Sequence, residues 1–281
     1  MKVLVLGSDG LLGSRLLAEL RPNRKFVAVG TSRRQSSDYF FDFNIGDLIN
    51  LIRVVKPDYI INCIAVTSRS DGWLRSIQVN SVLPITLAVL SKILRFQVIH
   101  FSSNVVFSGK RRNNSESSLI FPKSRYAITK ALGDMSLFGS LIIRTSFIGD
   151  HLSSTDSMDL VARLKREKDG SLYKIEEDHY WNGVTVDVIL ILIRNFIIEG
   201  RRMNGVFHLF SDGNLLRHQV VELILEKVNK SKVKVSCDDQ AFLKNLALNT
   251  KKEGSHLWLW NLAGFNKVPT FHELLREMKV T

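Results

Sequence analysis

The sequence predicts an α/β fold, a Rossmann-like doubly wound parallel sheet followed by a smaller C-terminal lobe. The first observation is local: the apolar run Lys2–Leu6 passes into a glycine-rich turn, residues 7–13, and then into Ser14–Leu20, which has helical periodicity. The second is that apolar runs and helical patterns go on alternating up to Arg144. A continuous apolar run is typical of a strand covered on both faces of a parallel sheet. Alternating strands and helices predict right-handed crossovers between such strands.

The glycine-rich turn lies between a predicted strand and a predicted helix. In that context glycines three residues apart indicate a dinucleotide phosphate site, because they let the backbone approach a pyrophosphate at a helix N-terminus. We interpret the first glycine as the turn former and the last as the one that permits close helix packing. A tight turn without a ligand is the alternative. The residues of this turn that we assign to cofactor binding are Gly7, Asp9, Gly10, Leu11, Leu12 and Gly13.

The second predicted strand, Phe26–Val29, ends in a polar loop that contains Ser32 and Arg33. In dinucleotide sites an acidic residue near this position suits a free 2′-hydroxyl, whereas an arginine suits a 2′-phosphate. The loop carries two arginines and no carboxylate, so the sequence favours NADPH, with NADH as the alternative. Two exposed arginines in a polar loop would explain the same pattern.

Four further positions lie in or after predicted strands or at the start of a predicted helix. Asp42 lies in a short predicted strand, Phe41–Phe43, where it either bonds the adenine amino group or caps the turn before the next helix. Ala65 and Thr67 lie at the carboxyl end of the next buried strand, where ligands of doubly wound sheets gather. Asn80, at the head of an apolar helix, either faces the site or bonds the backbone.

A phenol and an amine are spaced for one face of a helix. Tyr126 and Lys130 are four residues apart in a segment with helical composition, so their side chains project one turn apart. A nearby positive charge lowers the pKa of a phenol, which would move Tyr126 toward the range useful for acid–base catalysis. Ser103, after the apolar strand Gln97–Phe101, could offer a hydroxyl to the same carbonyl or alcohol oxygen. This spacing alone is common on helix surfaces, so its weight depends on its surroundings.

Beyond Gly149 the pattern loosens. We predict a dinucleotide-binding domain over residues 1–149 and a mainly substrate-binding lobe over residues 150–281, from which a strand near residues 205–210 returns to the first sheet. The apolar stretch Val186–Ile198 is short and contains two charged residues. It therefore indicates a buried helix, and we expect no membrane span.

Composition narrows the partners and the compartment. The 281 residues include 39 basic and 27 acidic ones, for a net charge of +12. This charge suits phosphate-bearing molecules, but the basic residues are scattered and no nucleic-acid module is present, so we expect no nucleic-acid partner. Two cysteines and a start without a cleavage-type segment indicate a reduced, cytoplasmic protein. We find no metal-ligand spacing and expect no metal.

Six motifs stand in order along the chain. They are Gly7-x-x-Gly10-x-x-Gly13, Asn62-Cys63-x-Ala65-x-Thr67, Val79-Asn80, the run from Phe101 to Gly109, Pro122-x-x-x-Tyr126-x-x-x-Lys130, and Ile143-Arg144-Thr145-Ser146. Together they resemble the extended short-chain dehydrogenase/reductases, and among them the dTDP-4-dehydrorhamnose reductase branch. Residues 205–209 and the segment from Pro269 to Leu275 are also similar to that branch.

The resemblance implies roles for three of these residues. Lys130 would bind the nicotinamide ribose and tune Tyr126, Tyr126 would give a proton to a carbonyl oxygen, and Ser103 would hold that oxygen. It implies an NADPH-dependent reductase of a nucleotide-activated 4-keto sugar in surface polysaccharide or glycan synthesis, and it is compatible with a homodimer. Dehydratases of this superfamily carry an Asp-Glu pair where Asn104 and Val105 stand, so elimination of water is disfavoured.

Two other functions stay open. A nucleotide-sugar epimerase or epimerase-reductase would need a further acid–base pair, for which Cys63 and His179 are the candidates. A non-catalytic, nucleotide-binding regulatory subunit would keep the fold without the chemistry. In the C-terminal lobe, the basic residues that could meet a substrate diphosphate are Arg163, Lys165 and Arg166.

Overall fold

The computed structural model describes residues 1–34, 37–67, 71–110, 114–151, 159–175, 178–237 and 244–280. The chain divides into two compact units, each assembled from separate stretches of sequence. Unit 1 contains Met1–Val106, Ile120–Arg144 and Ile193–Phe207. Unit 2 contains Phe107–Leu119, Thr145–Leu192 and His208–Thr281.

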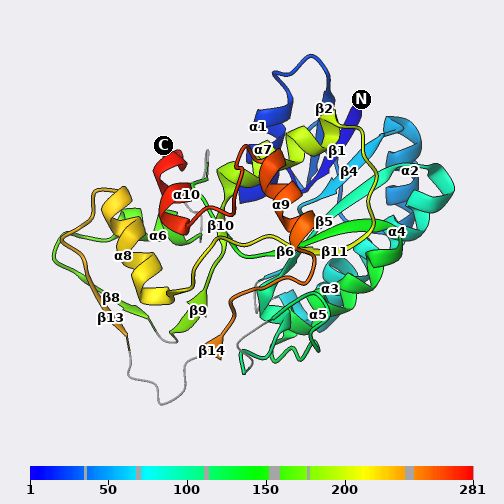
Figure 1. Cartoon of the computed structure of the whole chain (residues 1–281). Helices are drawn as coiled ribbons and strands as arrows, with labels where there is room; N and C mark the ends of the chain where they lie inside the picture. The colour runs from blue at the N-terminus through cyan, green and yellow to red at the C-terminus, as the bar shows by residue number, and fades with distance from the viewer. Residues whose placement is uncertain are drawn as a thin grey trace. The chain divides into compact units, whose positions relative to one another are not determined.

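The main sheet has seven strands in the order β11-β6-β5-β4-β1-β2-β3 (Figure 1). The described ladders β1–β2, β1–β4, β4–β5 and β2–β3 are parallel. The chain leaves β1 toward β2 on one side and later returns to β4 on the other, which is the switch point where doubly wound sheets bind ligands. The strands are β1 (Lys2–Leu6), β2 (Val27–Ser32), β3 (Tyr39–Phe40), β4 (Tyr59–Asn62), β5 (Gln97–Ser103), β6 (Ser140–Thr145) and β11 (Gly205–His208).

Helices of unit 1 cover the sheet and bury its apolar side chains. Leu4 and Leu6 of β1 pack against α2 and α4 in one core cluster. The side chain of Asn44 caps α2 by accepting the amide of Asp47 at 2.8 Å, and Lys56 ends this helix with φ 49°. The helical segments are α1 (Leu11–Leu20), α2 (Ile45–Val55), α3 (Gly72–Ile77), the π turn Gln78–Val82, α4 (Leu83–Leu94), the 3-10 turn Asn104–Val106, α5 (Arg125–Gly133) and the 3-10 turn Asp134–Phe138.

The predicted strand Phe41–Phe43 is wrong. The strand β3 comes earlier, where Tyr39 and Phe40 pair with the end of β2, and Asp42 lies after it. The capping role considered for Asp42 is also wrong, because Asn44 supplies the cap. The predicted strand near residue 205 is confirmed as β11, which joins the first sheet beside β6.

Unit 2 has its own apolar core. Helix α8 contributes Val220, Val221 and Ile224 to a cluster that includes Trp181 and Phe271. Its elements are β7 (Phe147–Ile148), α6 (Leu160–Arg166), β8 (Leu172–Ile175), β9 (His179–Trp181), β10 (Val184–Thr185), β12 (Leu215–Leu216), α8 (Arg217–Lys227), β13 (Lys234–Cys237), β14 (Lys244–Asn245), α9 (Glu253–Leu262) and α10 (Phe271–Glu277). Helix α7 (Val186–Ile198) begins in unit 2 and ends in unit 1.

The observed division of the chain differs in two places from the predicted division at a single boundary near residue 149. Residues 107–119 group with unit 2, because the Asn114 side chain donates to the carbonyl oxygens of Asn245 and Ala247. Residues 193–207 group with unit 1, where the Gln97 side chain bonds both the amide and the carbonyl of Met203. Each of these segments therefore contacts residues far away in the sequence that belong to the same unit.

Two apolar helical stretches bear on membrane insertion. The stretch Val186–Ile198 is confirmed as a largely buried helix, α7. Among the described residues, one helical stretch, Gly72–Leu94, is long enough for a membrane span and contains an 18-residue window of mean hydropathy 1.6, of which 44% is buried. Core helices of soluble proteins meet the same criterion, so this stretch is weak evidence for a span.

Candidate active site

The glycine turn after β1 brings a helix N-terminus up to the sheet. Gly7 has φ +82°, a left-handed conformation that favours glycine. A Cβ on Gly13 would lie 2.1 Å from the carbonyl oxygen of Gly7, so the third glycine lets α1 pack directly on the turn. Gly10 is the N-cap of α1 and provides no side-chain cap. The first amides of α1, which include those of Leu11 and Leu12, therefore form a positive end suited to an anion.

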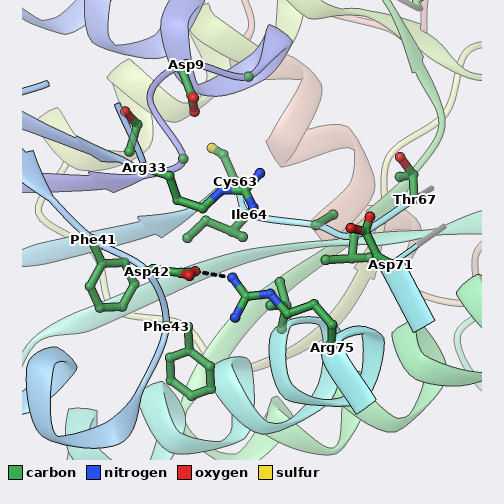
Figure 2. Close-up of a pocket in the computed structure, with 16 residues that line it drawn as sticks. Asp9, Arg33, Phe41, Asp42, Phe43, Cys63, Ile64, Thr67, Asp71 and Arg75 are labelled. Carbon is green, nitrogen blue, oxygen red and sulfur yellow. Dashed lines mark hydrogen bonds and ion pairs between the residues drawn. The ribbon is translucent and has the colours of Figure 1, made fainter. Parts of the chain in front are cut away.

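A hollow of about 220 Å³ lies at this edge of the sheet (Figure 2). All of its lining residues belong to unit 1. Residues assigned to cofactor binding from the sequence that line it are Gly7, Asp9, Gly10, Ser32, Arg33, Asp42, Ala65 and Thr67. The glycine geometry, the exposed helix terminus and the position at the switch point fit a dinucleotide.

Charged side chains occupy two parts of this hollow. Asp42 pairs with Arg75 of α3, and the rings of Phe41 and Phe43, which pack edge to face, line the same part of the hollow (Figure 2). Arg33 lies at the other side near Asp9, whose carboxylate is 3.7 Å from Nε of Arg34. Our sequence reasoning missed Arg75, because its helix lies far along the chain and no motif marks it.

Asn80 supports the wall of the hollow from behind. Its side chain is fully buried, accepts the amide of Val66 at 2.9 Å, donates to the carbonyl of Val66 at 2.9 Å, and donates to the hydroxyl of Thr129 at 3.0 Å. Of the two roles considered for Asn80, the structure shows the bond to backbone. Asn80 thereby ties the segment after β4 to helix α5.

Ser103, Tyr126 and Lys130 come together from two elements. Ser103 ends β5, and the other two lie on α5, which begins where the hydroxyl of Ser124 accepts the amide of Ala127 at 3.1 Å. Tyr126 and Ser103 share a side-chain hydrogen bond. Nζ of Lys130 donates to the carbonyl oxygen of Phe101 at 2.5 Å. The phenol and the amine are therefore both held at the carboxyl end of β5.

The electrostatics of Tyr126 differ from the sequence expectation. Burial raises the pKa of Tyr126 to about 12, and the hydrogen bond with Ser103 opposes this only in part. The expectation that a lysine charge would lower the pKa of this phenol is therefore wrong, because desolvation dominates. Burial also lowers the pKa of Lys130 to about 8. At neutral pH Tyr126 is a protonated phenol, which makes it a proton donor.

His100 is a further member of this group that sequence reasoning missed. It lies on β5, is 1% exposed, and its ring nitrogens are 3.1 Å from Nδ2 of Asn62 and 3.3 Å from Nζ of Lys130. A polar residue inside the apolar strand Gln97–Phe101 was the signal that could have found it. Only the pairing of β4 with β5 shows what it contacts.

The remaining candidates have different surroundings. Cys63 lines the hollow, and burial raises the pKa of its thiol far above the ordinary value, so it is not poised to act as a base. In unit 2, Lys165 is engaged with Asp150 at 2.6 Å, and Arg163 donates to the hydroxyl of Tyr173. In the part of the chain that the structure describes, no group of three or more His, Cys, Asp or Glu side chains is arranged to hold a metal ion.

Solved structures show the same fold. A dTDP-4-dehydrorhamnose reductase from Bacillus anthracis, in complex with NADP, has a TM-score of 0.80 at 20% identity, over 99% of this chain and 98% of that one. One from Clostridium acetobutylicum has a TM-score of 0.77 at 19% identity, over 99% and 98%. UDP-glucose 4-epimerase from Thermotoga maritima, with UDP-glucose, has a TM-score of 0.76 at 18% identity, over 99% and 97%.

Sequence comparison gives the family. No curated protein matches the chain significantly. The family described as the RmlD substrate binding domain matches residues 1–274, which is nearly the whole chain. The expected α/β fold and the expected relationship to dTDP-4-dehydrorhamnose reductases are both confirmed. This chain belongs to the RmlD substrate binding domain family.

Proposed function

We propose that this protein is an NADPH-dependent reductase of a nucleotide-activated 4-keto sugar. The observation that carries the proposal is the convergence of Ser103, Tyr126 and Lys130 at the carboxyl end of β5. These three do not line the hollow that fits a dinucleotide, but Lys130 interacts electrostatically with Cys63, which does. Family membership over residues 1–274 supports the same reaction class. Structural neighbours solved with NADP or NAD support a nicotinamide cofactor.

The roles follow from the chemistry of the three side chains. Bound NADPH would supply the hydride that adds to the carbonyl carbon. Tyr126 holds its proton at neutral pH and would transfer it to the carbonyl oxygen, so that the ketone becomes an alcohol. Ser103 bonds Tyr126 and would orient the same oxygen. Lys130, cationic below its pKa of about 8, would bind ribose hydroxyls and stabilise negative charge on the oxygen.

We infer that the nucleotide sugar is held by unit 2. Arg163 of α6 and Arg217 of α8 lie near Tyr173, and each guanidinium feels the charge of the other. Neighbouring arginines suit a diphosphate, which would relieve their repulsion. Lys165, also considered from the sequence, has its charge matched by Asp150. We place the enzyme in the cytoplasm, where the free thiols of Cys63 and Cys237 would stay reduced.

The test is a purified-protein assay of NADPH oxidation with a panel of 4-keto-6-deoxy sugar nucleotides. We expect turnover with at least one of them, and a loss of kcat of roughly 100-fold or more in Tyr126→Phe, with NADPH binding retained. Tyr59→Phe is the matched control, because it removes a tyrosine hydroxyl that donates to the carbonyl of Arg201 at 3.3 Å. No NADPH oxidation with any substrate, or full activity in Tyr126→Phe, would refute the proposal.

An epimerase is the second candidate, favoured by the likeness to UDP-glucose 4-epimerase. The same three side chains would serve it, with the cofactor retained between turnovers. Inversion at the alcohol carbon, with no net NADPH consumption and no deuterium taken up from solvent, would support an epimerase that retains its cofactor. Deuterium from solvent at a carbon beside a carbonyl would indicate an additional acid–base pair. Deuterium delivered from the labelled nicotinamide to the carbonyl carbon, with one NADPH consumed per product, would support reduction.

A further inference from the structure

Asn62 and His100 form a buried polar chain that ends at Lys130. They are cross-strand partners in the register of β4 and β5, so their side chains lie on one face of the sheet. Asn62 and His100 are each 1% exposed, and Lys130 is 2% exposed. Nδ2 of Asn62 is 3.1 Å from Nδ1 of His100, and Nε2 of His100 is 3.3 Å from Nζ of Lys130. The reaction scheme above uses neither Asn62 nor His100.

The backbone fixes the direction of this chain. The amide of Ile64 donates to Oδ1 of Asn62 at 3.2 Å. An amide N–H can only donate, so the oxygen of Asn62 must face Ile64 and its NH₂ group must face His100. That NH₂ group also only donates, so Nδ1 of His100 accepts and carries no proton. A neutral imidazole then has its proton on Nε2, which faces the amine of Lys130.

This tautomer affects the charge state of Lys130. The Nε2–H group can donate to Nζ only when the amine offers its lone pair, and an ammonium would set two donors face to face. Burial makes such a conflict costly, because water does not reach the pair. The direction of the lysine pKa agrees, since burial lowers it to about 8. The pKa of His100 lies well below its ordinary value, first through burial and then through the charge of Lys130.

The other ionisable groups around Lys130 either raise its pKa or carry no charge at neutral pH. Asp134 raises the pKa of Lys130, although Arg144 engages its carboxylate at 2.6 Å. Cys63 would raise it as a thiolate, but the pKa of Cys63 lies so high that it remains a thiol. Tyr126, one turn earlier on α5, keeps its proton at neutral pH. The effect of the Asn62–His100 chain on the pKa of Lys130 can therefore be tested separately from the effects of these three groups.

We propose that His100, held by Asn62 in the Nε2–H tautomer, is a positioning residue that fixes the Lys130 amine and sets its affinity for a proton. The role in catalysis rests on the proposed reductase function, whereas the tautomer and its effect on Lys130 exist without turnover. The lysine that serves the cofactor would accordingly be adjusted from the sheet side by a side chain that touches neither cofactor nor substrate.

The direct test is long-range ¹H–¹⁵N spectroscopy of the full chain labelled at histidine, with His100 assigned through its backbone. We expect the Nε2–H tautomer with no titration between about pH 6 and 9. A proton on Nδ1, or an imidazolium that titrates in this range, would overturn the proposal. This measurement uses the wild-type protein and does not depend on any variant folding.

The variant Asn62→Asp reverses the direction of the chain. A carboxylate accepts from both Ile64 and Nδ1–H of His100, so Nε2 would turn its lone pair toward the Lys130 ammonium. We expect the titration of Lys130, followed by the ¹³Cε shift of labelled lysine, to move upward by about one pH unit or more. Asn80→Asp is the matched control, because it adds the same charge to a buried asparagine that bonds Thr129 and not His100. An equal shift in both variants would mean that charge alone acts, and would overturn the proposal.

The kinetic readout separates this proposal from the proposed function. If the protein is a reductase, the alkaline limb of kcat/KM should move upward in Asn62→Asp together with the lysine titration. A shifted lysine titration with an unmoved limb would leave His100 without a catalytic role. If no sugar nucleotide is reduced, the reductase assignment fails while the tautomer and the lysine shift can still be observed.

Discussion

The amine of Lys130 donates to the carbonyl oxygen of Phe101 at 2.5 Å, which ties the helix that carries Tyr126 to the strand that carries Ser103. This one bond joins residues 29 positions apart and is buried from solvent. It holds the amine at the carboxyl end of β5, so a contact between α5 and β5 fixes the position of the amine relative to Ser103.

The pH profile should report Lys130. Its pKa of about 8 means an ammonium below that pH and an amine above it, so kcat/KM should fall above about pH 8. Tyr126, with a pKa of about 12, stays a phenol throughout this range and does not produce the limb. The measurement is kcat/KM from pH 6 to 10, in wild type and in Lys130→Arg, which keeps its charge at alkaline pH. If kcat/KM of Lys130→Arg fell above the same pH as in wild type, the alkaline limb could not be assigned to Lys130.

The third glycine of the turn should not tolerate a side chain. Gly13→Ala places a Cβ 2.1 Å from the Gly7 carbonyl oxygen, so α1 must move away from the turn. We expect about 1–3 kcal/mol lower stability, from overpacking, and weaker NADPH binding. Gly46→Ala is the control, because its new Cβ would lie 3.5 Å from Oδ1 of Asn44, an ordinary van der Waals distance, and alanine favours a helix. The measurements are denaturant unfolding and NADPH titration of both variants. A Gly13→Ala protein with the stability and NADPH affinity of wild type would contradict the expectation.

Arg33 should decide between the two nicotinamide cofactors. If its guanidinium bonds the 2′-phosphate, Arg33→Ala loses about 1.5–3 kcal/mol of NADPH binding, or roughly 10- to 100-fold in Kd, and leaves NADH binding unchanged. Arg53→Ala, an exposed position on α2 outside the hollow, is the control. The measurement is the Kd of NADPH and of NADH, from fluorescence titration of wild type, Arg33→Ala and Arg53→Ala. Equal affinities for NADPH and NADH in wild type would remove the basis for this preference.

The buried ion pair behind α5 should matter for stability. Asp134 accepts from Nε of Arg144 at 3.1 Å and from Nη2 at 2.6 Å, with both side chains at least 95% buried. Asp134→Ala leaves a buried guanidinium without this carboxylate, so we expect a loss of about 3–5 kcal/mol in chemical denaturation. Asp169→Ala, which removes an exposed pair with Lys230, should change stability by less than about 1 kcal/mol. Similar losses in the two variants would show that burial does not set the difference.

The sequence predicted local structure best where a pattern repeats or a glycine is required. The apolar run of β1, the turn with Gly7 and Gly13, and the Tyr126–Lys130 helix are local features, and each appears close to the predicted residues. The strand placed at Phe41–Phe43 failed because pairing with the end of β2, and not the apolar pattern, decides where β3 lies. Likewise Asn44 took the cap that we considered for Asp42.

What the sequence by itself determined is the alternation of strands and helices up to Arg144, the glycine turn, the resemblance to the family and the three residues proposed for catalysis. Only the tertiary structure decided how these residues are charged and what stands behind them. Burial, which no motif records, raises the pKa of Tyr126 and lowers that of Lys130. The contact of His100 with Asn62 exists because β4 lies beside β5 in the sheet, and its contact with Lys130 exists because α5 packs on β5. Desolvation and cross-strand pairing depend on neighbours distant in sequence, and only the folded chain brings those neighbours together.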